Sequence, residues 1–317
     1  VQRTKIVAAL KAMDADIYAL LEVFGNSSLN DLCTALNTAC QTNQYKYIEN
    51  STANQGMACF IYNSNTVIPF KELQKNRLAD NGYLPARKIA QAFDLKANNE
   101  RFIVCLNHWK AKDNSYNKPD EYADTGDGQG SHVLRRVHEA EATLEFIKTV
   151  TAYFEDEDVL IVGDLNSYSK EDPIRVLEEG ELINELQKYA PNEYSYAFFS
   201  NNSYATGYLD HSFATATLDA QIRYAHPFHI NADEPDALKI GGKPQEDNMY
   251  RCSYHNPIVT FIKLGTTTGI ESPTLSRPDI ELIGDPRSGY LTLVSNTDFV
   301  LIRAEIVNIG GQIIAAY

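Results

Sequence analysis

The feature that most constrains this chain is a short apolar run that ends abruptly in polar residues. Val159 to Val162 is followed at once by Gly163-Asp164-Leu165-Asn166. A run of this length predicts a buried strand. Side chains alternate along a strand, so Asp164 and Asn166 point to the same side where it ends. An acid and an amide placed in this way can hold a water molecule against a phosphorus centre.

The composition is that of a folded globular protein, with 317 residues and 44% hydrophobic side chains, and allows one large or two unequal domains. No apolar stretch approaches the ~20 residues that a membrane span needs, so we expect no integral membrane segment. The net charge of −14 disfavours long-range attraction to nucleic acid or an anionic membrane. An anionic substrate would therefore need a metal ion or a local basic patch. The five cysteines show no metal-type spacing, and no secretory signal opens the chain.

The apolar pattern alternates between helical and strand periods up to Leu264. Helices are expected from Thr4 to Met13, Leu29 to Cys40, Val133 to Val150 and from Pro173, and strands at Ile17 to Leu21, Lys46 to Glu49, Met57 to Tyr62, Lys88 to Leu95, Arg101 to Asn107, Val159 to Val162 and from His211 and Pro257. The two strands near Lys88 and Arg101 look like a hairpin, and residues 113 to 130 predict a long polar loop. Beyond Leu264, a Thr-rich linker and short alternating runs predict a small β module at residues 265 to 317.

Five polar side chains stand at predicted strand ends. Glu22, His108 and Asp164 end their strands, whereas Asp210 and His255 begin theirs. Antiparallel pairing would gather all five on one rim of a mixed sheet, where sites of layered α/β proteins commonly lie.

These residue types suit hydrolysis of a phosphoester. Glu22 could bind a hard divalent cation, and Asp164 and Asn166 could orient the attacking water. The two histidines could stabilise charge on phosphoryl oxygens. Asp210 would fix the tautomer of His255.

A structural interpretation exists for each of these residues. Asp164 and Asn166 could form a turn after a buried strand, and Glu22 could be a surface acid. Both histidines could be satisfied core residues, and Asp210 could cap a turn. His211 is expected to face the side of its strand opposite to Asp210.

Arg87 and Arg135 are candidates to bind the phosphate of a substrate. For Arg136 the solvated or ion-paired interpretation is favoured. Trp109 and the tyrosines could stack on bases or sugars, but aromatic residues are more commonly core, and we expect that here.

Taken in order, several segments resemble the endonuclease/exonuclease/phosphatase superfamily, with the closest similarity to large secreted bacterial nucleases. The resemblance covers most of residues 1 to 264. It rests on Arg3-Thr4-Lys5-Ile6-Val7, Asp14-Ala15-Asp16-Ile17, Arg87 with Ala90-Gln91, Asn107-His108-Trp109-Lys110, Gly163-Asp164-Leu165-Asn166-Ser167-Tyr168, Glu171-Asp172-Pro173-Ile174, Gly207-Tyr208-Leu209-Asp210-His211 and His229-Ile230-Asn231-Ala232-Asp233-Glu234-Pro235.

The resemblance implies a four-layer α/β/β/α sandwich with two mixed sheets. It also implies hydrolysis of phosphodiesters with Mg²⁺, or with Mn²⁺ or Ca²⁺. It assigns one role to each candidate residue: metal carboxylate to Glu22, phosphate contact to His108, positioning of water and transition state to Asp164 and Asn166, general base to His255, and its partner to Asp210.

The sequence departs from the family pattern in two places. The family's first strand, which supplies an Asn near the metal, would precede the helix at which this chain begins. Tyr254 stands where the family motif Ser-Asp-His has a metal-binding Asp. A phenol with a pKa of about 10 stays neutral at pH 7 and is a poor ligand for Mg²⁺, so this residue could weaken or abolish the activity.

The C-terminal module loosely resembles the β-sandwich sorting domains that Bacteroidetes append to secreted proteins. The similarity lies in Asp285-Pro286-Arg287-Ser288-Gly289-Tyr290-Leu291-Thr292-Leu293 and Val307-Asn308-Ile309-Gly310-Gly311-Gln312. It implies export to the cell surface or medium, and an immunoglobulin-like spacer is the alternative.

Three classes of function remain open, in this order. The first is a secreted, metal-dependent nuclease with nucleic acid as its substrate. The second is a phosphoesterase for lipids or small molecules, which the acidic net charge suits equally well. The third is a degenerate, non-catalytic surface module.

Overall fold

The computed structural model describes residues 2–50, 56–77, 87–113, 122–200, 203–240 and 248–265, together with four short strands between 280 and 316. The chain divides into two compact units, Val1–Thr266 and Thr267–Tyr317. Within the described residues, no helix has the length and apolar character needed to cross a membrane.

A six-stranded mixed sheet forms the centre of the first unit. In spatial order its strands are β4 (Val67–Lys75), β5 (Lys88–Leu95), β6 (Arg101–His108), β7 (Val159–Asp164), β11 (Asp210–Ala214) and β8 (Ile183–Asn184). β6 and β7 run parallel and the other neighbours antiparallel. The predicted hairpin is β5 with β6. The parallel pair needs a long crossover, which α3 (Val133–Phe154) provides.

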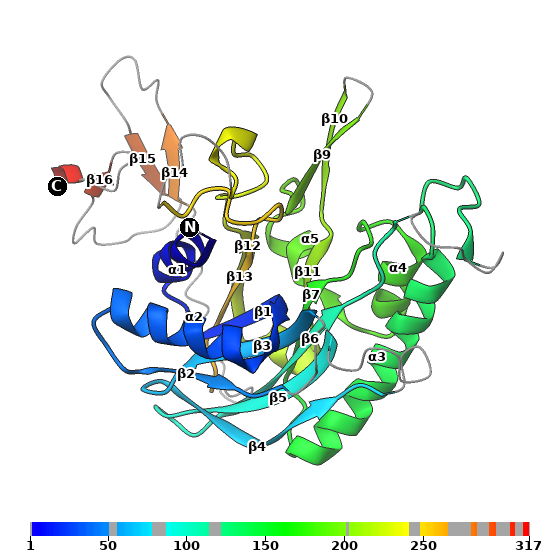
Figure 1. Ribbon diagram of the computed structural model, residues 1–317, viewed down its shortest axis with the longest axis horizontal. Helices are drawn as coiled ribbons and strands as arrows, with labels where there is room; N and C mark the ends of the chain where they lie inside the picture. Colours follow the sequence, from blue (N-terminus) through cyan, green and yellow to red (C-terminus); the bar gives the residue numbers. More distant parts are fainter. Residues whose placement is uncertain are drawn as a thin grey trace. The chain divides into compact units, whose positions relative to one another are not determined.

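A second sheet is antiparallel throughout its described strands, in the order β1 (Ile17–Phe24), β3 (Gly56–Asn63) and β2 (Tyr45–Ile48). The helices α1 (Gln2–Met13) and α2 (Gly25–Ala39) share a hydrophobic cluster with this sheet. Figure 1 shows α1 and α2 on one outer side, and α3 with α4 (Asp172–Glu179) on the other.

The two-residue period of the strands sorts most buried apolar side chains of the described residues into three large cores, which separate four layers. In β3, Met57, Cys59 and Ile61 pack with α1 and α2, whereas Ala58 and Phe60 pack between the sheets.

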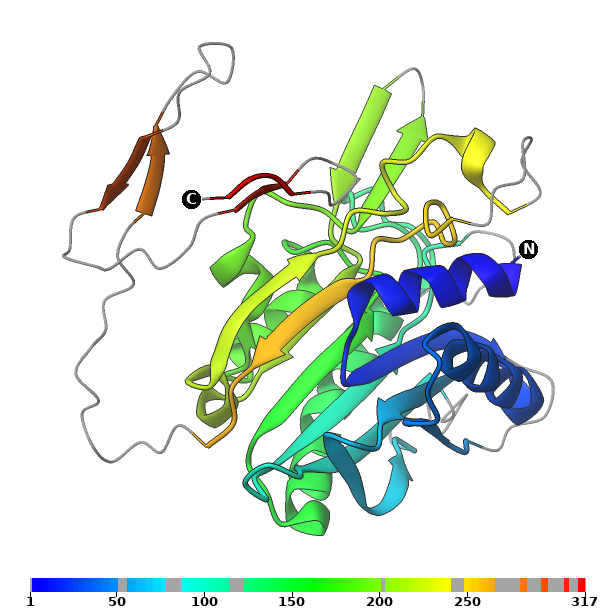
Figure 2. The same ribbon diagram turned by 90° about the vertical axis from the view of Figure 1, so that its left-hand side faces the viewer.

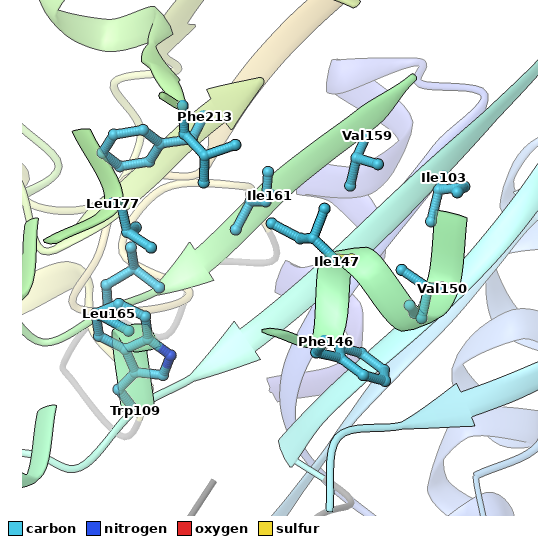
Figure 3. Packing of buried hydrophobic residues seen from close by; sticks show 14 of the residues in the cluster. Ile103, Trp109, Phe146, Ile147, Val150, Val159, Ile161, Leu165, Leu177 and Phe213 are labelled. Carbon is cyan, nitrogen blue, oxygen red and sulfur yellow. The ribbon is translucent and has the colours of Figure 1, made fainter. Parts of the chain in front are cut away.

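The central strand β7 shows the same alternation. Val159 and Ile161 pack with Ile147 and Val150 of α3 (Figure 3), whereas Leu160 points between the two sheets. The α/β/β/α sandwich implied by the resemblance is therefore confirmed. The expectation of two mixed sheets holds for the six-stranded sheet only, because the described strands of the second sheet pair antiparallel.

The remaining elements are short. They are α5 (Glu185–Tyr189), the hairpin β9 (Tyr196–Ser200) with β10 (Ser203–Gly207), α6 (Ala216–Asp219), the antiparallel pair β12 (Ile222–Pro227) and β13 (Ile258–Ile262), and the 3₁₀ turn η4 (Asp236–Leu238). The β9–β10 hairpin extends away from the sheets (Figure 1, Figure 2). The sequence did not predict β4, β9, β10 or β12.

The second unit contains two antiparallel pairs in its described residues, β14 (Ile280–Ile283) with β15 (Thr292–Ser295) and β16 (Glu305–Val307) with β17 (Ile313–Ala316). Most residues behind the sorting-domain resemblance lie outside the described ones, so that identification stays a prediction. Residues 114–121 of the predicted polar loop also lie outside them.

Candidate active site

Three ionisable residues meet where neighbouring strands of the six-stranded sheet end or begin. His108 of β6 is in register with Asp164 of β7, and Asp210 of β11 is in register with the same Asp164. Hydrogen-bonded strands lie about 4.8 Å apart, so this register brings the three residues into one row. His108 Nε2 lies 3.8 Å from Asp164 Oδ2.

Glu22 reaches this row from the other sheet. Its carboxylate Oε1 lies 3.8 Å from His108 Nε2. Glu22 sits where the β1–β3 register shifts and has a φ of 58°, which is an uncommon conformation for a residue with a side chain. Gly56 on β3 makes room for it, since a Cβ at Gly56 would lie 3.1 Å from the Cα of Glu22. Gly56 is not among the site residues predicted from the sequence, although a glycine inside a strand pattern is a recognised sign of a bulge.

His255 forms the closest contact in the site. Its Nδ1 lies 2.7 Å from Asp210 Oδ2, so Nε2 is the nitrogen that remains for proton transfer. The ring also packs against Tyr196 of β9, with the ring centroids 4.8 Å apart.

The prediction that all five residues lie on one sheet rim was wrong. His108, Asp164 and Asp210 do so, but Glu22 belongs to the three-stranded sheet, and His255 precedes β13, which pairs with β12. Glu22 approaches the row because the two sheets face each other, and His255 joins it through its contact with Asp210.

Burial and neighbouring charges shift the protonation of this group. Burial raises the pKa of Asp164 to about 7, with a further contribution from the charge of Asp210. Burial alone would lower the pKa of His255, but the charge and hydrogen bond of Asp210, with the charges of Asp164 and Glu22, outweigh it and raise this pKa to about 9. Burial, with the positive charge of Arg87, lowers the pKa of His108 to about 4. Without a bound cation, His255 is therefore charged and His108 neutral at pH 7.

The side chains fit a divalent cation. Among the described residues, Asp164, Asp210 and His255 offer ligand atoms that all lie within 4.8 Å of one another. Carboxylate oxygens are the ligands that Mg²⁺, Mn²⁺ and Ca²⁺ take in proteins. The raised pKa of Asp164 reflects burial first and then the nearby charge of Asp210, and a cation would offset both effects.

Asn166 forms a turn after β7, as one interpretation of the sequence expected, and lies beside Asp164, as the other required. Its backbone N–H donates to Asp164 Oδ1 at 2.9 Å, and its side-chain amide donates to the carbonyl of Trp109 at 3.1 Å. The residue has a φ of 49°, so it does form a turn, and that turn fixes it beside Asp164. Its action on water stays a prediction.

The three arginines considered as phosphate ligands lie in different surroundings. Arg87 donates from Nε to the carbonyl of Gly56 at 3.2 Å, and its charge acts on His108, so it lies at the edge of the site. Arg136 is fully buried and donates to Ser167 Oγ and to the carbonyl of Ser131, so it is structural. Arg135 is the third residue of α3 and half-buried, and its contact with phosphate stays a prediction.

Two further residues discussed above, His211 and Trp109, are buried, and a third, Tyr254, is exposed. His211 is buried and contacts the carbonyl of Ser167 at 2.7 Å, on the far side of β11 as expected. Trp109 is buried in the core on the α3 side, as expected. Tyr254 is 60% exposed, with the Arg251 guanidinium 5.4 Å from its ring centre.

No family model matches the sequence, and no curated protein matches it either. Several solved structures share the fold. A mannosyl-6-phosphatase of Bacteroides thetaiotaomicron has 16% identity and a TM-score of 0.56, covering 82% of this chain and 90% of the other. An endonuclease/exonuclease/phosphatase of Bacteroides vulgatus has 15% identity and a TM-score of 0.55, covering 83% and 90%. TDP2 of D. rerio, in complex with a single-stranded DNA product, has 13% identity and a TM-score of 0.51, covering 81% and 90%.

At these identities the similarity shows the fold. The chain has the fold of the endonuclease/exonuclease/phosphatase proteins, as its ordered motifs predicted.

Proposed function

We propose that this protein is a phosphodiester hydrolase that uses a divalent cation, Mg²⁺ in the first place, with nucleic acid as its substrate. The observation that carries the proposal is the hydrogen bond between His255 and Asp210, placed beside Asp164 and within the electrostatic reach of Glu22. A histidine–carboxylate pair next to a buried acid is the arrangement that general acid–base chemistry needs.

The chain's own residues would share the work as follows. His255, oriented through Nδ1 by Asp210, exchanges a proton at Nε2 with the attacking water or with a phosphoryl oxygen. Asp164 and the turn at Asn166 hold the water in line with the phosphorus. His108, neutral at pH 7, contributes a hydrogen bond rather than a charge. A cation bound by Glu22 and the neighbouring carboxylates would polarise a phosphoryl oxygen and offset its negative charge.

We favour nucleic acid as the substrate for two reasons. The ordered motifs are most similar to those of secreted bacterial nucleases, and the TDP2 structure of the same fold holds a single-stranded DNA product. A small phosphoester is the second candidate. It is favoured by the net charge of −14 and by the mannosyl-6-phosphatase of the same fold.

One panel of substrates tests the proposal. Turnover of plasmid DNA, RNA, sphingomyelin and a chromogenic phosphate ester is measured in the presence of Mg²⁺, Mn²⁺ or Ca²⁺, and in the presence of a chelator. We expect turnover of DNA or RNA that the chelator abolishes and that Asp164→Asn lowers strongly. Preferential turnover of the small ester would favour the second candidate. Absence of turnover, with no cation binding by calorimetry, would instead indicate a non-catalytic module.

We also propose that the protein is exported, as the similarity of residues 265 to 317 to sorting domains implies. Fractionation of producing cells would test this. Recovery from the cytoplasm alone would contradict it.

A further inference from the structure

Two loops behind the candidate general base are joined by a pair of buried asparagines. The Asn231 loop, residues 228–236, follows β12, and the His255 loop, residues 251–257, precedes β13. The side chains of Asn231 and Asn256 belong one to each loop and are 2% and 0% exposed. A buried side-chain amide costs stability unless its N–H and C=O groups are hydrogen-bonded. The hydrogen-bond partners of each asparagine therefore identify the backbone that it fixes in place.

Asn231 binds the backbone of the His255 loop at three points. Its Nδ2 donates to the carbonyl oxygen of His255 itself at 2.7 Å. Its Oδ1 accepts the backbone N–H groups of Cys252 at 2.9 Å and Ser253 at 3.3 Å. One side chain thus fixes the backbone on both sides of Tyr254.

Asn256 makes the reciprocal contacts. Its Oδ1 accepts the backbone N–H groups of Ile230 at 3.2 Å, Asn231 at 2.8 Å and Ala232 at 2.9 Å. Its Nδ2 lies 3.3 Å from Asp233 Oδ1. Each loop therefore supplies the asparagine that binds the backbone of the other.

Ser195 connects this pair of loops to Asp210. Its Oγ accepts the backbone N–H groups of Leu209 and Asp210, each at 3.1 Å. Its carbonyl oxygen accepts the N–H of Asn256 at 2.7 Å. Ser195 is fully buried, so the backbone of Asp210 and that of the residue after His255 are tied to one interior residue.

We propose that Asn231, acting with Asn256 and Ser195, is a positioning residue that holds the imidazole of His255 against Asp210. The proposal rests on the proposed function. Asn231 fixes the backbone of His255, and Ser195 fixes the backbone of Asp210. Without these hydrogen bonds, we expect the 2.7 Å contact between the two side chains to lose its alignment. A displacement of about 1 Å at a reacting group can cost on the order of 100-fold in rate.

The test compares Asn231→Ala and Ser195→Ala with Asn184→Ala. Asn184 is a matched control, since it is also buried and also binds backbone, capping α5 through the N–H of Gln187 at 3.1 Å. Kinetics are measured on plasmid DNA with Mg²⁺ below the melting temperature of every variant.

We expect kcat to fall by at least about tenfold in Asn231→Ala and Ser195→Ala, with KM changed by less than about twofold, as for a defect in transition-state positioning. Asn184→Ala should keep the kcat of the unaltered protein. A kcat of Asn231→Ala that matches that of Asn184→Ala would overturn the proposal.

A second readout does not depend on activity. The proton shared by His255 Nδ1 and Asp210 should give a downfield NMR resonance, which Asp210→Asn removes and so identifies. We expect this resonance in the unaltered protein and in Asn184→Ala, and its loss in Asn231→Ala. An unchanged resonance in Asn231→Ala would refute positioning, whereas its loss in a protein that cleaves no phosphoester would refute only the proposed function.

Discussion

Replacing Asp210 by Asn should lower the pKa of His255. Asp210 lies 2.7 Å from His255 Nδ1, and its charge and hydrogen bond are the largest contributions that oppose burial. Without them, burial is opposed only by the charges of Asp164 and Glu22, so the pKa of His255 should fall from about 9 toward its ordinary value of 6.5.

The size of the effect follows from the shift. A change from 6.5 to about 9 corresponds to about 3 kcal/mol at 1.36 kcal/mol for each pKa unit. This figure is the net of opposing effects, because burial lowers the pKa while two other carboxylates raise it together with Asp210. The His255 side chain is 28% exposed, so solvent screening reduces the figure further.

The sign of the pH dependence follows by linkage. The pKa of His255 is raised on folding, so its contribution to stability is fully present below about pH 6.5 and is lost as the pH rises through about 9. Asp210→Asn should therefore destabilise most at pH 6 and least above pH 9. The same substitution relieves the repulsion on Asp164, whose raised pKa costs stability above about pH 4, so the two effects oppose each other near neutral pH.

The pKa itself is thus the cleaner readout. It is measured by NMR titration of the His255 ring in cation-free protein, with urea unfolding at pH 6 and pH 9.5 as the companion. An unchanged His255 pKa in Asp210→Asn, or a loss of stability that does not shrink as the pH rises, would show that Asp210 does not set the protonation of His255.

Three further substitutions test other parts of the structure. Gly56→Ala places a Cβ 3.1 Å from the Cα of Glu22, and should weaken Mn²⁺ binding by calorimetry; affinity equal to that of the unaltered protein would count against Glu22 as a ligand. Glu139→Ala removes the partner of Lys88, whose Nζ lies 2.6 Å from Glu139 Oε1 with both side chains 2% exposed. Because it leaves a buried charge uncompensated, it should cost about 3–5 kcal/mol in urea unfolding, and the double substitution Lys88→Met with Glu139→Leu should recover most of this. Tyr254→Asp should raise metal-dependent phosphodiesterase activity on the substrate panel, and no gain would contradict the placement of the metal.

The strand ends that carry chemistry were predictable because a local signal marks them. Asp164 follows an apolar run, and His108 ends a strand that pairs in a hairpin. A period of two within each run fixes which residues share a face, so the row formed by His108, Asp164 and Asp210 follows once the strand order is known.

The other parts of the site depend on contacts that sequence periodicity does not encode. The bulge that turns Glu22 toward His108 needs Gly56 on a neighbouring strand. The joining of Asn231 and Asn256 is a tertiary event between two irregular loops. The β9–β10 hairpin was missed because its polar and aromatic residues follow no clear two-residue period.

Diffraction from crystals soaked with Mn²⁺ tests the central claim most directly, because the anomalous signal locates the cation independently of any assay. We predict one strong peak beside Glu22, within coordination distance of a carboxylate oxygen of Asp164 or Asp210. A cation bound elsewhere on the molecule, with none beside Glu22, would contradict it.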